Sequence, residues 1–398
     1  MSHPNNFSLL LSITTALLLL IIQALHPVKA NYNIMSYGAK SDGQSDSSGP
    51  ISSAWQAACM STGSSTIYIP SGTFMLKPIT LNGPCTSNKI IIQIDGTLVA
   101  PSSYSTAIQQ WIMFKQVDGV SIYGGTINGQ GQTLWSCKSS KEWILIVLFL
   151  ILKSLIFSNS KNIMISGLTS INSELYHIAI NGCEGVQVQG VKISAPGNSP
   201  NTDGIHVQMS TNVTITGTGI KTGDDCVSIG PGTTDLWIER VTCGPGHGIS
   251  IGSLGKDKEE KGVQNVIVKN TVFTGSQNGL RIKTWGRPSD GFVKGVVFEH
   301  ALMQNVQNPI IIDQNYCPHN DGCPDQNSGV KISGVTYNDI QGSSATQVAM
   351  NFDCSPSNPC SGIVLEDIKL TYGDKLAESS CKNVDGTASG LVVPPSCL

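Results

Sequence analysis

Three aspartates and one histidine recur along the chain at equal spacing. Asp203 and Asp225 are 22 residues apart, His247 follows 22 residues after Asp225, and Asp224 directly precedes Asp225. A chain that winds with a fixed period returns such residues to one face, so we expect these side chains to lie side by side on adjacent turns. Neighbouring carboxyl groups raise one another's pKa, because two like charges in one site cannot both form cheaply. The cluster therefore offers a general acid and a general base at mildly acidic pH.

The segments that begin with these residues align as strands. Asp203, Asp225 and His247 each precede a small residue and then an apolar–polar–apolar triplet, and Asn278 begins a fourth such segment. Because side chains alternate along a strand, one column of this alignment should point into the core and the next should point outward. The inward column is Ile205, Val227, Ile249 and Leu280, and the outward column is His206, Ser228, Ser250 and Arg281, with Lys283 two residues further on.

Two turns with acids and one turn with His247 are followed by a turn that carries bases. Hydrolysis of a glycosidic bond needs one carboxylic acid to protonate the leaving oxygen and one carboxylate to activate water or to attack directly. Arg281 and Lys283 would bind an anionic substrate, since a guanidinium group offers two parallel hydrogen bonds to a carboxylate. Carboxyl groups that could cleave a glycosidic bond would lie beside basic residues that could bind a substrate carboxylate. This combination indicates a polymer of uronic acid as the substrate.

Each motif has a simpler interpretation when it is taken alone. An Asp-Asp pair is often a turn or a solvated edge, an Arg-x-Lys pair is usually a solvated strand face, and clustered carboxylates can bind calcium through their oxygens. The glycine-rich segment 244–248 is typical of a tight turn, and it lacks the lysine and hydroxyl of a phosphate-binding loop. The common phase across four turns favours a catalytic site over these separate interpretations.

The rest of the chain predicts the scaffold that repeats these positions. Short β-branched runs recur after small or amide residues at steps of 23, 27, 23, 30 and 30 residues, and no amphipathic segment of helix length separates them. The runs are 162–165, 185–188, 212–215, 235–238, 265–268 and 295–298, and 329–332 continues the series. A β-propeller blade is longer, at roughly 40 residues, and a β-sandwich gives no reason for the fixed phase. We therefore predict an all-β fold, a single-domain parallel β-helix over 31–398.

Composition restricts the class of protein further. Only 13% of the 398 residues are charged, against about 25% in ordinary domains, and the net charge is −3. No basic patch indicates nucleic acid as a partner. An apolar run over 9–22 followed by Val28-Lys29-Ala30 predicts a signal peptide over 1–30 that is cleaved after Ala30. A retained membrane anchor is the alternative, and the run is short for that role.

The cysteines agree with secretion. All twelve lie beyond the signal segment, which fits an oxidising compartment. Close spacing suggests five disulfides, although sequence alone does not fix connectivity. The suggested pairs are Cys59–Cys85, Cys226–Cys243, Cys317–Cys323, Cys354–Cys360 and Cys381–Cys397. A glycosylation sequon at Asn212-Val213-Thr214 is also consistent with secretion.

Four segments together resemble the signature motifs of polygalacturonases, glycoside hydrolase family 28. They are Asn201-Thr202-Asp203, Gly223-Asp224-Asp225, Gly246-His247-Gly248 and Arg281-Ile282-Lys283, in the family's order and spacing. The resemblance covers essentially the whole mature chain and implies a right-handed parallel β-helix. It also implies hydrolysis of α-1,4-galacturonosyl linkages by single displacement with inversion. Segments 195–202 and 281–323 are similar to plant members, particularly pollen-type exopolygalacturonases, so we expect exo action, with endo action as the alternative.

The resemblance implies a role for each matching residue. Asp224 is expected to be the general acid, Asp203 and Asp225 to activate water, and His247 to support the acid. The residues expected to bind substrate are Asn201, Arg281, Lys283 and Tyr316. No cofactor and no metal is implied. The implied partner is pectin, as homogalacturonan, and we expect a secreted, monomeric protein of the cell wall without stable membrane insertion after signal cleavage.

One segment departs from the family's pattern. Residues 143–152 form an unbroken apolar run where the family usually has a polar loop with a second cysteine, so Cys137 and Cys183 are expected to be free. Ten apolar residues are too few to span a bilayer. We interpret the run as a translated intron or a gene-model error, and the sequence of the transcript would test this hypothesis.

Two other functions fit the same scaffold. A polysaccharide lyase would use calcium and a basic residue to abstract a proton, and it would release an unsaturated product that absorbs ultraviolet light. A non-catalytic wall protein would hold pectin without cutting it. The intact acids at 203, 224 and 225 argue against the second of these functions.

Overall fold

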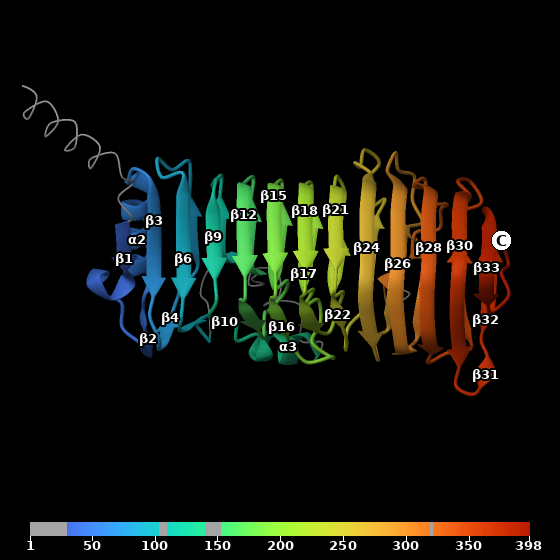
Figure 1. Ribbon diagram of the computed structural model, residues 1–398, viewed down its shortest axis with the longest axis horizontal. Helices are drawn as coiled ribbons and strands as arrows, with labels where there is room; N and C mark the ends of the chain where they lie inside the picture. Colours follow the sequence, from blue (N-terminus) through green and yellow to red (C-terminus); the bar gives the residue numbers. More distant parts are fainter. Residues whose placement is uncertain (1–29, 103–109, 140–152, 319–320) are drawn as a thin grey trace, which may run out of the picture.

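The chain is wound into one elongated solenoid. The computed structural model describes residues 30–102, 110–139, 153–318 and 321–398. Turns stack along the long axis from β1 at one end to β33 at the other (Figure 1). Among the described strands every pairing is parallel except that of β30 with β31. The predicted right-handed parallel β-helix is confirmed. Most of the predicted signal peptide (1–29) and the whole apolar run at 143–152 lie outside the described residues.

Two sheets enclose the core. In the described part of the chain the smaller sheet has 11 strands, one from each turn. They are β5 (Ile79–Asn82), β8 (Gln110–Lys115), β11 (Lys153–Ser158), β14 (Ile178–Asn181), β17 (Ile205–Gln208), β20 (Val227–Ile229), β23 (Ile249–Leu254), β25 (Asn278–Trp285), β27 (Asn308–Tyr316), β29 (Val348–Asp353) and β32 (Glu378–Lys382).

The larger sheet has 22 strands within the described ranges, and several turns contribute two strands to it. The strands before the middle of the chain are β1 (Ala30–Asn33), β2 (Asp42–Asp46), β3 (Ser64–Ile69), β4 (Thr73–Met75), β6 (Lys89–Ile94), β7 (Thr97–Val99), β9 (Val120–Tyr123), β10 (Thr126–Asn128), β12 (Lys161–Ser166), β13 (Thr169–Ile171), β15 (Glu184–Gln189) and β16 (Lys192–Ser194). The remaining strands are β18 (Thr211–Thr216), β19 (Gly219–Lys221), β21 (Thr234–Glu239), β22 (Thr242–Cys243), β24 (Val263–Thr274), β26 (Phe292–Val306), β28 (Lys331–Ser344), β30 (Cys360–Tyr372), β31 (Lys375–Leu376) and β33 (Val384–Val393).

The backbone conformation explains why small and amide residues recur before the strands of the repeat. On most turns of the larger sheet, one such residue with positive φ comes just before the buried run. These residues are Gly119, Asn162, Gly185, Asn212, Asp235, Asn265, Gly295, Gly334 and Gly362. Glycine, asparagine and aspartate enter this left-handed region at the lowest cost. The side chains at these positions also form hydrogen bonds between adjacent turns. Nδ2 of Asn265, for example, donates to Oδ1 of Asp235 over 3.0 Å. The predicted strands at 162–298 follow this pattern and are confirmed as β12, β15, β18, β21, β24 and β26.

The last predicted run, 329–332, is wrong in its register. Val296 pairs with Val335, so the segment equivalent to 295–298 is 334–337. Residues 329–332 resemble the repeated sequence pattern because Val330 is an apolar residue that is fully buried just before β28 begins. A side chain at Gly329 would collide with the backbone of Ser289, so glycine is needed there for close packing and not for the repeat.

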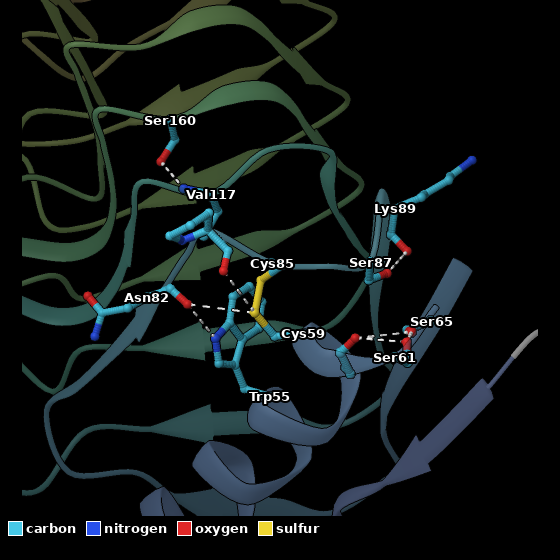
Figure 2. The surroundings of a disulfide bond; sticks show 12 residues. Trp55, Cys59, Ser61, Ser65, Asn82, Cys85, Ser87, Lys89, Val117 and Ser160 are labelled. Atoms are coloured by element: carbon cyan, nitrogen blue, oxygen red, sulfur yellow. Dashed lines mark hydrogen bonds between the residues drawn. A yellow bond between two sulfur atoms is a disulfide. The ribbon is translucent and has the colours of Figure 1, made fainter. Parts of the chain in front are cut away.

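A helix covers the N-terminal end of the core. Helix α2 (Ser48–Met60) lies beside β1 and β3 (Figure 1), and it buries Ile51, Ala54 and Trp55 among other residues. Figure 2 shows the indole Nε1 of Trp55 donating to the carbonyl of Asn82 over 3.0 Å, next to the disulfide at Cys59. Without this cover the first turn would expose its apolar face to water. The other described helices are the 3-10 helix η1 (Ile34–Tyr37) and α3 (Gln132–Ser139).

The five suggested disulfides are all confirmed. Cys183 is buried and has a free thiol, as predicted, whereas the side chain of Cys137 lies outside the described residues. No helix within the described ranges is long and apolar enough to cross a membrane.

Candidate active site

The outer face of the 11-stranded sheet carries the predicted site residues. Strands β17, β20, β23 and β25 pair in the predicted register, which places His206 level with Ser228, Ser250 and Arg281. The inward column Ile205, Val227, Ile249 and Leu280 is fully buried. The prediction of both columns is confirmed.

Loops before β17 and β20 deliver the three acids to this face, and the loop before β23 delivers His247. The amide of Gly204 donates to the carbonyl of Asp225 over 2.9 Å, so the two turns are joined directly at the acids. Beneath them, the hydroxyls of Thr202 and Thr222 lie 2.7 Å apart and are buried. Any side chain at Gly223 would collide with the backbone of Ser199. The glycines of the motifs therefore let successive turns approach closely enough to cluster the carboxyls.

Asp225 is held as a carboxylate by three donors. Its Oδ1 accepts from Nη2 of Arg281 at 2.6 Å and from the Ser250 hydroxyl at 2.8 Å, and its Oδ2 accepts from Nζ of Lys283 at 2.8 Å. Its residue exposure is 1%, and burial alone would raise its pKa. The charges of Lys283 and Arg281 outweigh burial and lower the pKa of Asp225 to about 2. Asp225 is therefore ionised throughout the mildly acidic range.

Asp203 is buried one turn away and has the opposite tendency. Burial, followed by the charges of Asp224 and Asp225, raises the pKa of Asp203 well above its ordinary value. Lys283 is near enough to oppose this shift but does not cancel it. The pKa values of these two neighbouring acids are therefore shifted in opposite directions.

Asp224 is the most accessible of the three acids, and it lies between an amide and an imidazole. Its Oδ1 is 3.2 Å from Nδ1 of His247, and its Oδ2 accepts from Nδ2 of Asn201 at 3.3 Å. The backbone amide of Asp225 also donates to Asp224 Oδ1 at 2.8 Å. The side chain of Asp224 is 18% exposed, against 2% for that of Asp225. The structure thus brings His247 and Asn201 to the acid that can reach a substrate.

Lys283 connects the acids to an aromatic pair. Its Nζ lies 5.1 Å from the ring centre of Tyr316, and this ring packs edge-to-face on Trp285 at 5.5 Å. Tyr316 is half-buried at the end of β27, one turn beyond Lys283. All eight predicted site residues therefore lie on four consecutive turns and the next strand, β27.

Sequence reasoning missed two residues that also belong to this site. Burial, together with the charges of Asp203, Asp224 and Asp225, raises the pKa of Tyr176, so its hydroxyl lies near all three acids. Its ring packs against that of His206 at a tilt of 31°, with the ring centres 4.8 Å apart, and Nζ of Lys153 lies 5.3 Å from the centre of the Tyr176 ring. Burial lowers the pKa of Lys153, and the charge of Asp203 opposes that shift. Tyr176 and Lys153 lie outside the four motifs, and no spacing signal in the sequence points to them.

The acids are arranged for proton chemistry more than for cation binding. Asp224, Asp225 and His247 do place ligand atoms within 4.8 Å of one another. However, both oxygens of Asp225 already accept from cationic donors, and a metal ion would displace two buried charges from their partner. Leaving buried charges unpaired costs about 3–5 kcal/mol. The calcium interpretation is therefore the weaker one.

A carboxylate beside further carboxyl groups, one of them accessible, is an arrangement that can supply the acid and the base of glycoside hydrolysis. The chain belongs to glycoside hydrolase family 28, since the model described as "Glycosyl hydrolases family 28" matches residues 59–391.

Relatives and a solved structure agree with this membership. The chain is 58% identical over 369 residues to "Polygalacturonase" of Prunus persica, covering 92% of this chain and 93% of that one. It is 42% identical over 370 residues to "Exopolygalacturonase" of Platanus acerifolia, covering 91% and 96%. The fold is similar to that of endo-xylogalacturonan hydrolase from Aspergillus tubingensis, with a TM-score of 0.79, 24% identity and coverage of 91% and 100%.

Proposed function

We propose that the protein is a secreted, monomeric pectin hydrolase of the cell wall that cleaves α-1,4-galacturonosyl linkages of polygalacturonate, releasing residues from a chain end. The observation that carries the proposal is the cluster of Asp203, Asp224 and Asp225 on one outer face, in which neighbours fix Asp225 as a carboxylate. Family membership and the names of the peach and plane-tree relatives support the same substrate.

Asp224 is the proposed general acid. It is the acid with the greatest access to solvent of the three, and His247 and Asn201 orient its two oxygens. Protonation of the leaving oxygen by a placed carboxyl contributes about 10²–10⁴-fold to the rate. Asp203 and Asp225 are proposed to hold the attacking water and accept its proton, which gives inversion because water attacks the anomeric carbon in a single displacement.

Arg281 and Lys283 are proposed to bind a carboxylate of the substrate while they hold Asp225. Arg281 uses Nε for Ser250 and Nη2 for Asp225, and Lys283 gives one bond to Asp225. A guanidinium group has five N–H donors and an ammonium group has three, so both residues keep donors for a second anion. A substrate carboxylate that shares these cations would weaken their hold on Asp225 and make it a stronger base. Tyr316 would cover the sugar next to Lys283.

Exo action is the finer part of the proposal, and endo action is its alternative. The plane-tree relative is named an exopolygalacturonase, and the peach relative, at higher identity, is named only a polygalacturonase.

The test is incubation of the mature protein with de-esterified polygalacturonate in the presence of a chelator, while product size and new reducing ends are followed together. Monomer released from the start, without ultraviolet absorbance, is the expected result. Mixed oligomers would establish endo action, and an unsaturated product would identify a lyase. Binding without cleavage by the folded protein would leave only a wall-binding role. Glu184→Gln, which changes an exposed acid on β15, is the matched control for variants of the site.

A further inference from the structure

The outer face of the 11-stranded sheet changes the sign of its charge just beyond the cations of the site. Lys283 on β25 pairs with Asp313 on β27, and Asp313 pairs with Asp353 on β29. Lys382 on β32 follows in the same register. Ile312 is fully buried, so side-chain alternation turns the half-buried Asp313 toward the outer face. On its C-terminal side the site is therefore followed by an acid at the position of Lys283.

Asp313 has no ion pair in the part of the chain that the structure describes. Its Oδ1 accepts from the backbone amide of Asn315 at 2.9 Å, and no described group donates to its Oδ2. Lys283, its partner in register, reaches in the other direction, with its Nζ 2.8 Å from Oδ2 of Asp225. The lysine that could have neutralised Asp313 is thus used by the catalytic cluster.

Asp353, one strand further along, shows the contrast. Nζ of Lys382 lies 3.5 Å from its Oδ1, and Nδ2 of Asn315 donates to its Oδ2 over 3.1 Å. The charge of Asp353 is therefore offset by its own neighbours. Of these two acids, only Asp313 faces the groove without a cationic partner among the described residues.

The surroundings of Asp313 already disfavour negative charge. Burial, followed by the charge of Asp353, raises the pKa of Asp313, and the charges of Arg281 and Lys283 oppose that shift. A further anion placed against Asp313 would add like-charge repulsion in a half-buried setting. A polymer that carries a carboxylate on every sugar meets this repulsion as soon as it extends past Lys283.

We propose that Asp313 selects an uncharged sugar, a methyl-esterified galacturonate, at the position next to the sugar whose carboxylate Arg281 and Lys283 bind. The inference rests on the proposed function for the identity of the polymer. Hydroxyl groups of either sugar can donate to Oδ2 of Asp313, but only the free acid brings a second negative charge beside it. Fully de-esterified polygalacturonate remains a substrate, because repulsion at this one position lowers affinity without blocking the site.

Binding of galacturonate trimers to the full-length mature protein, measured by calorimetry at pH 6, tests the proposal. The probes are trigalacturonate and the three trimers that each carry one methyl ester. The Asp224→Asn background prevents turnover, and a chelator removes divalent cations that would bridge two carboxylates. One esterified trimer should bind about fivefold more tightly than trigalacturonate, which is the effect of relieving a like charge about 4 Å away in water. An ester on the sugar held by Arg281 and Lys283 should weaken binding instead.

A change of Asp313 should remove this preference. Asp313→Asn keeps an oxygen for the amide of Asn315 and should unfold like the parent, yet it should bind the esterified and the free trimer equally well. Glu184→Gln removes the same charge from an exposed position on β15 and should keep the preference. The preference should also fall in about 1 M salt, where the screening length is about 3 Å, which a contact with the methyl group alone would not explain.

The possible outcomes are separable. If no esterified trimer binds more tightly than trigalacturonate, or if Asp313→Asn keeps the preference, the proposal is overturned. If the preference is present but the wild type cleaves none of the trimers, only the proposed function is refuted. Failure to bind any trimer would overturn both.

Discussion

The turns that lead into β17 and β20 place an aspartate at the same point, yet the pKa values of the two carboxyl groups are shifted in opposite directions. Both side chains are buried, and their backbones are hydrogen-bonded to each other. Asp225 bonds to Arg281 and Lys283, which come from two turns further along, whereas the charges of Asp224 and Asp225 act on Asp203. A repeat therefore fixes where a side chain lies, and the neighbouring turns fix its charge.

The largest expected effect on activity comes from a change of Asp224, the proposed general acid. Asp224→Asn should lower kcat by about 10²–10⁴-fold, since it removes the transferable proton with little change of shape. Binding of polygalacturonate, measured by sedimentation or calorimetry, should be largely kept. Normal turnover by this variant would exclude Asp224 as the acid and shift that role to Asp203.

Removal of a cation should destabilise the turn of Asp225. Lys283→Met leaves a buried carboxylate with one charged partner fewer, and the expected loss is about 3 kcal/mol in the free energy of unfolding. Lys161→Met breaks a pair at 2.8 Å whose side chains are 62% and 57% exposed, and it should cost less than about 1 kcal/mol. Denaturant unfolding of both variants measures the contrast, and equal losses would show that the burial of Asp225 has no energetic consequence.

The two turns should also respond to pH with opposite sign. The folded pKa of Asp225 is lowered to about 2, so its stabilising contribution is complete above the ordinary aspartate pKa and is lost as pH falls toward 2. That contribution is about 2 kcal/mol from the size of the shift. The pKa of Asp203 is raised, so its contribution is present at low pH and is lost as pH rises through the folded value.

Unfolding free energies between pH 2 and pH 7 test this prediction. Asp225→Asn should flatten the acidic part of the curve, and Asp203→Asn should flatten the part at higher pH. If both variants altered the same part of the curve, the assignment of opposite pKa shifts to Asp203 and Asp225 would be contradicted.

A smaller effect is expected at Tyr316. Its ring lies 5.1 Å from Nζ of Lys283, and such a contact is worth about 0.5–1 kcal/mol. Tyr316→Leu should raise KM by a few fold at nearly unchanged kcat, and Tyr316→Phe, which keeps the ring, is the matched control. If the Phe variant is as impaired as the Leu variant, the hydroxyl and not the ring is the group that matters.

Much of this site could be predicted from the sequence because the fold is periodic. Equal spacing placed Asp203, Asp225 and His247 on adjacent turns, and strand alternation placed Arg281 and Lys283 on the same face. The pairing of these two bases with Asp225 was not predicted. Long side chains can reach back across two turns, and the spacing of residues does not reveal their direction. His206 was predicted to point outward, but spacing does not reveal that its ring nitrogens lie against Ser228 and Gln208.

Non-periodic parts of the chain were less accessible to sequence reasoning. Tyr176 and Lys153 reach the site from turns on the N-terminal side of the motifs, where no repeated residue type marks them. The run at 329–332 was misplaced because an apolar residue that packs before a strand looks the same in sequence as one within it.

The central claim is that these carboxyl groups activate water against a galacturonosyl linkage in one displacement. Proton NMR of a reaction in progress tests it most directly, by recording the anomeric configuration of the new reducing end before mutarotation. The account predicts that the first product has the β configuration, inverted from the α linkage. A first product that retains the α configuration would contradict the account, because it would require one of these aspartates to attack the sugar itself.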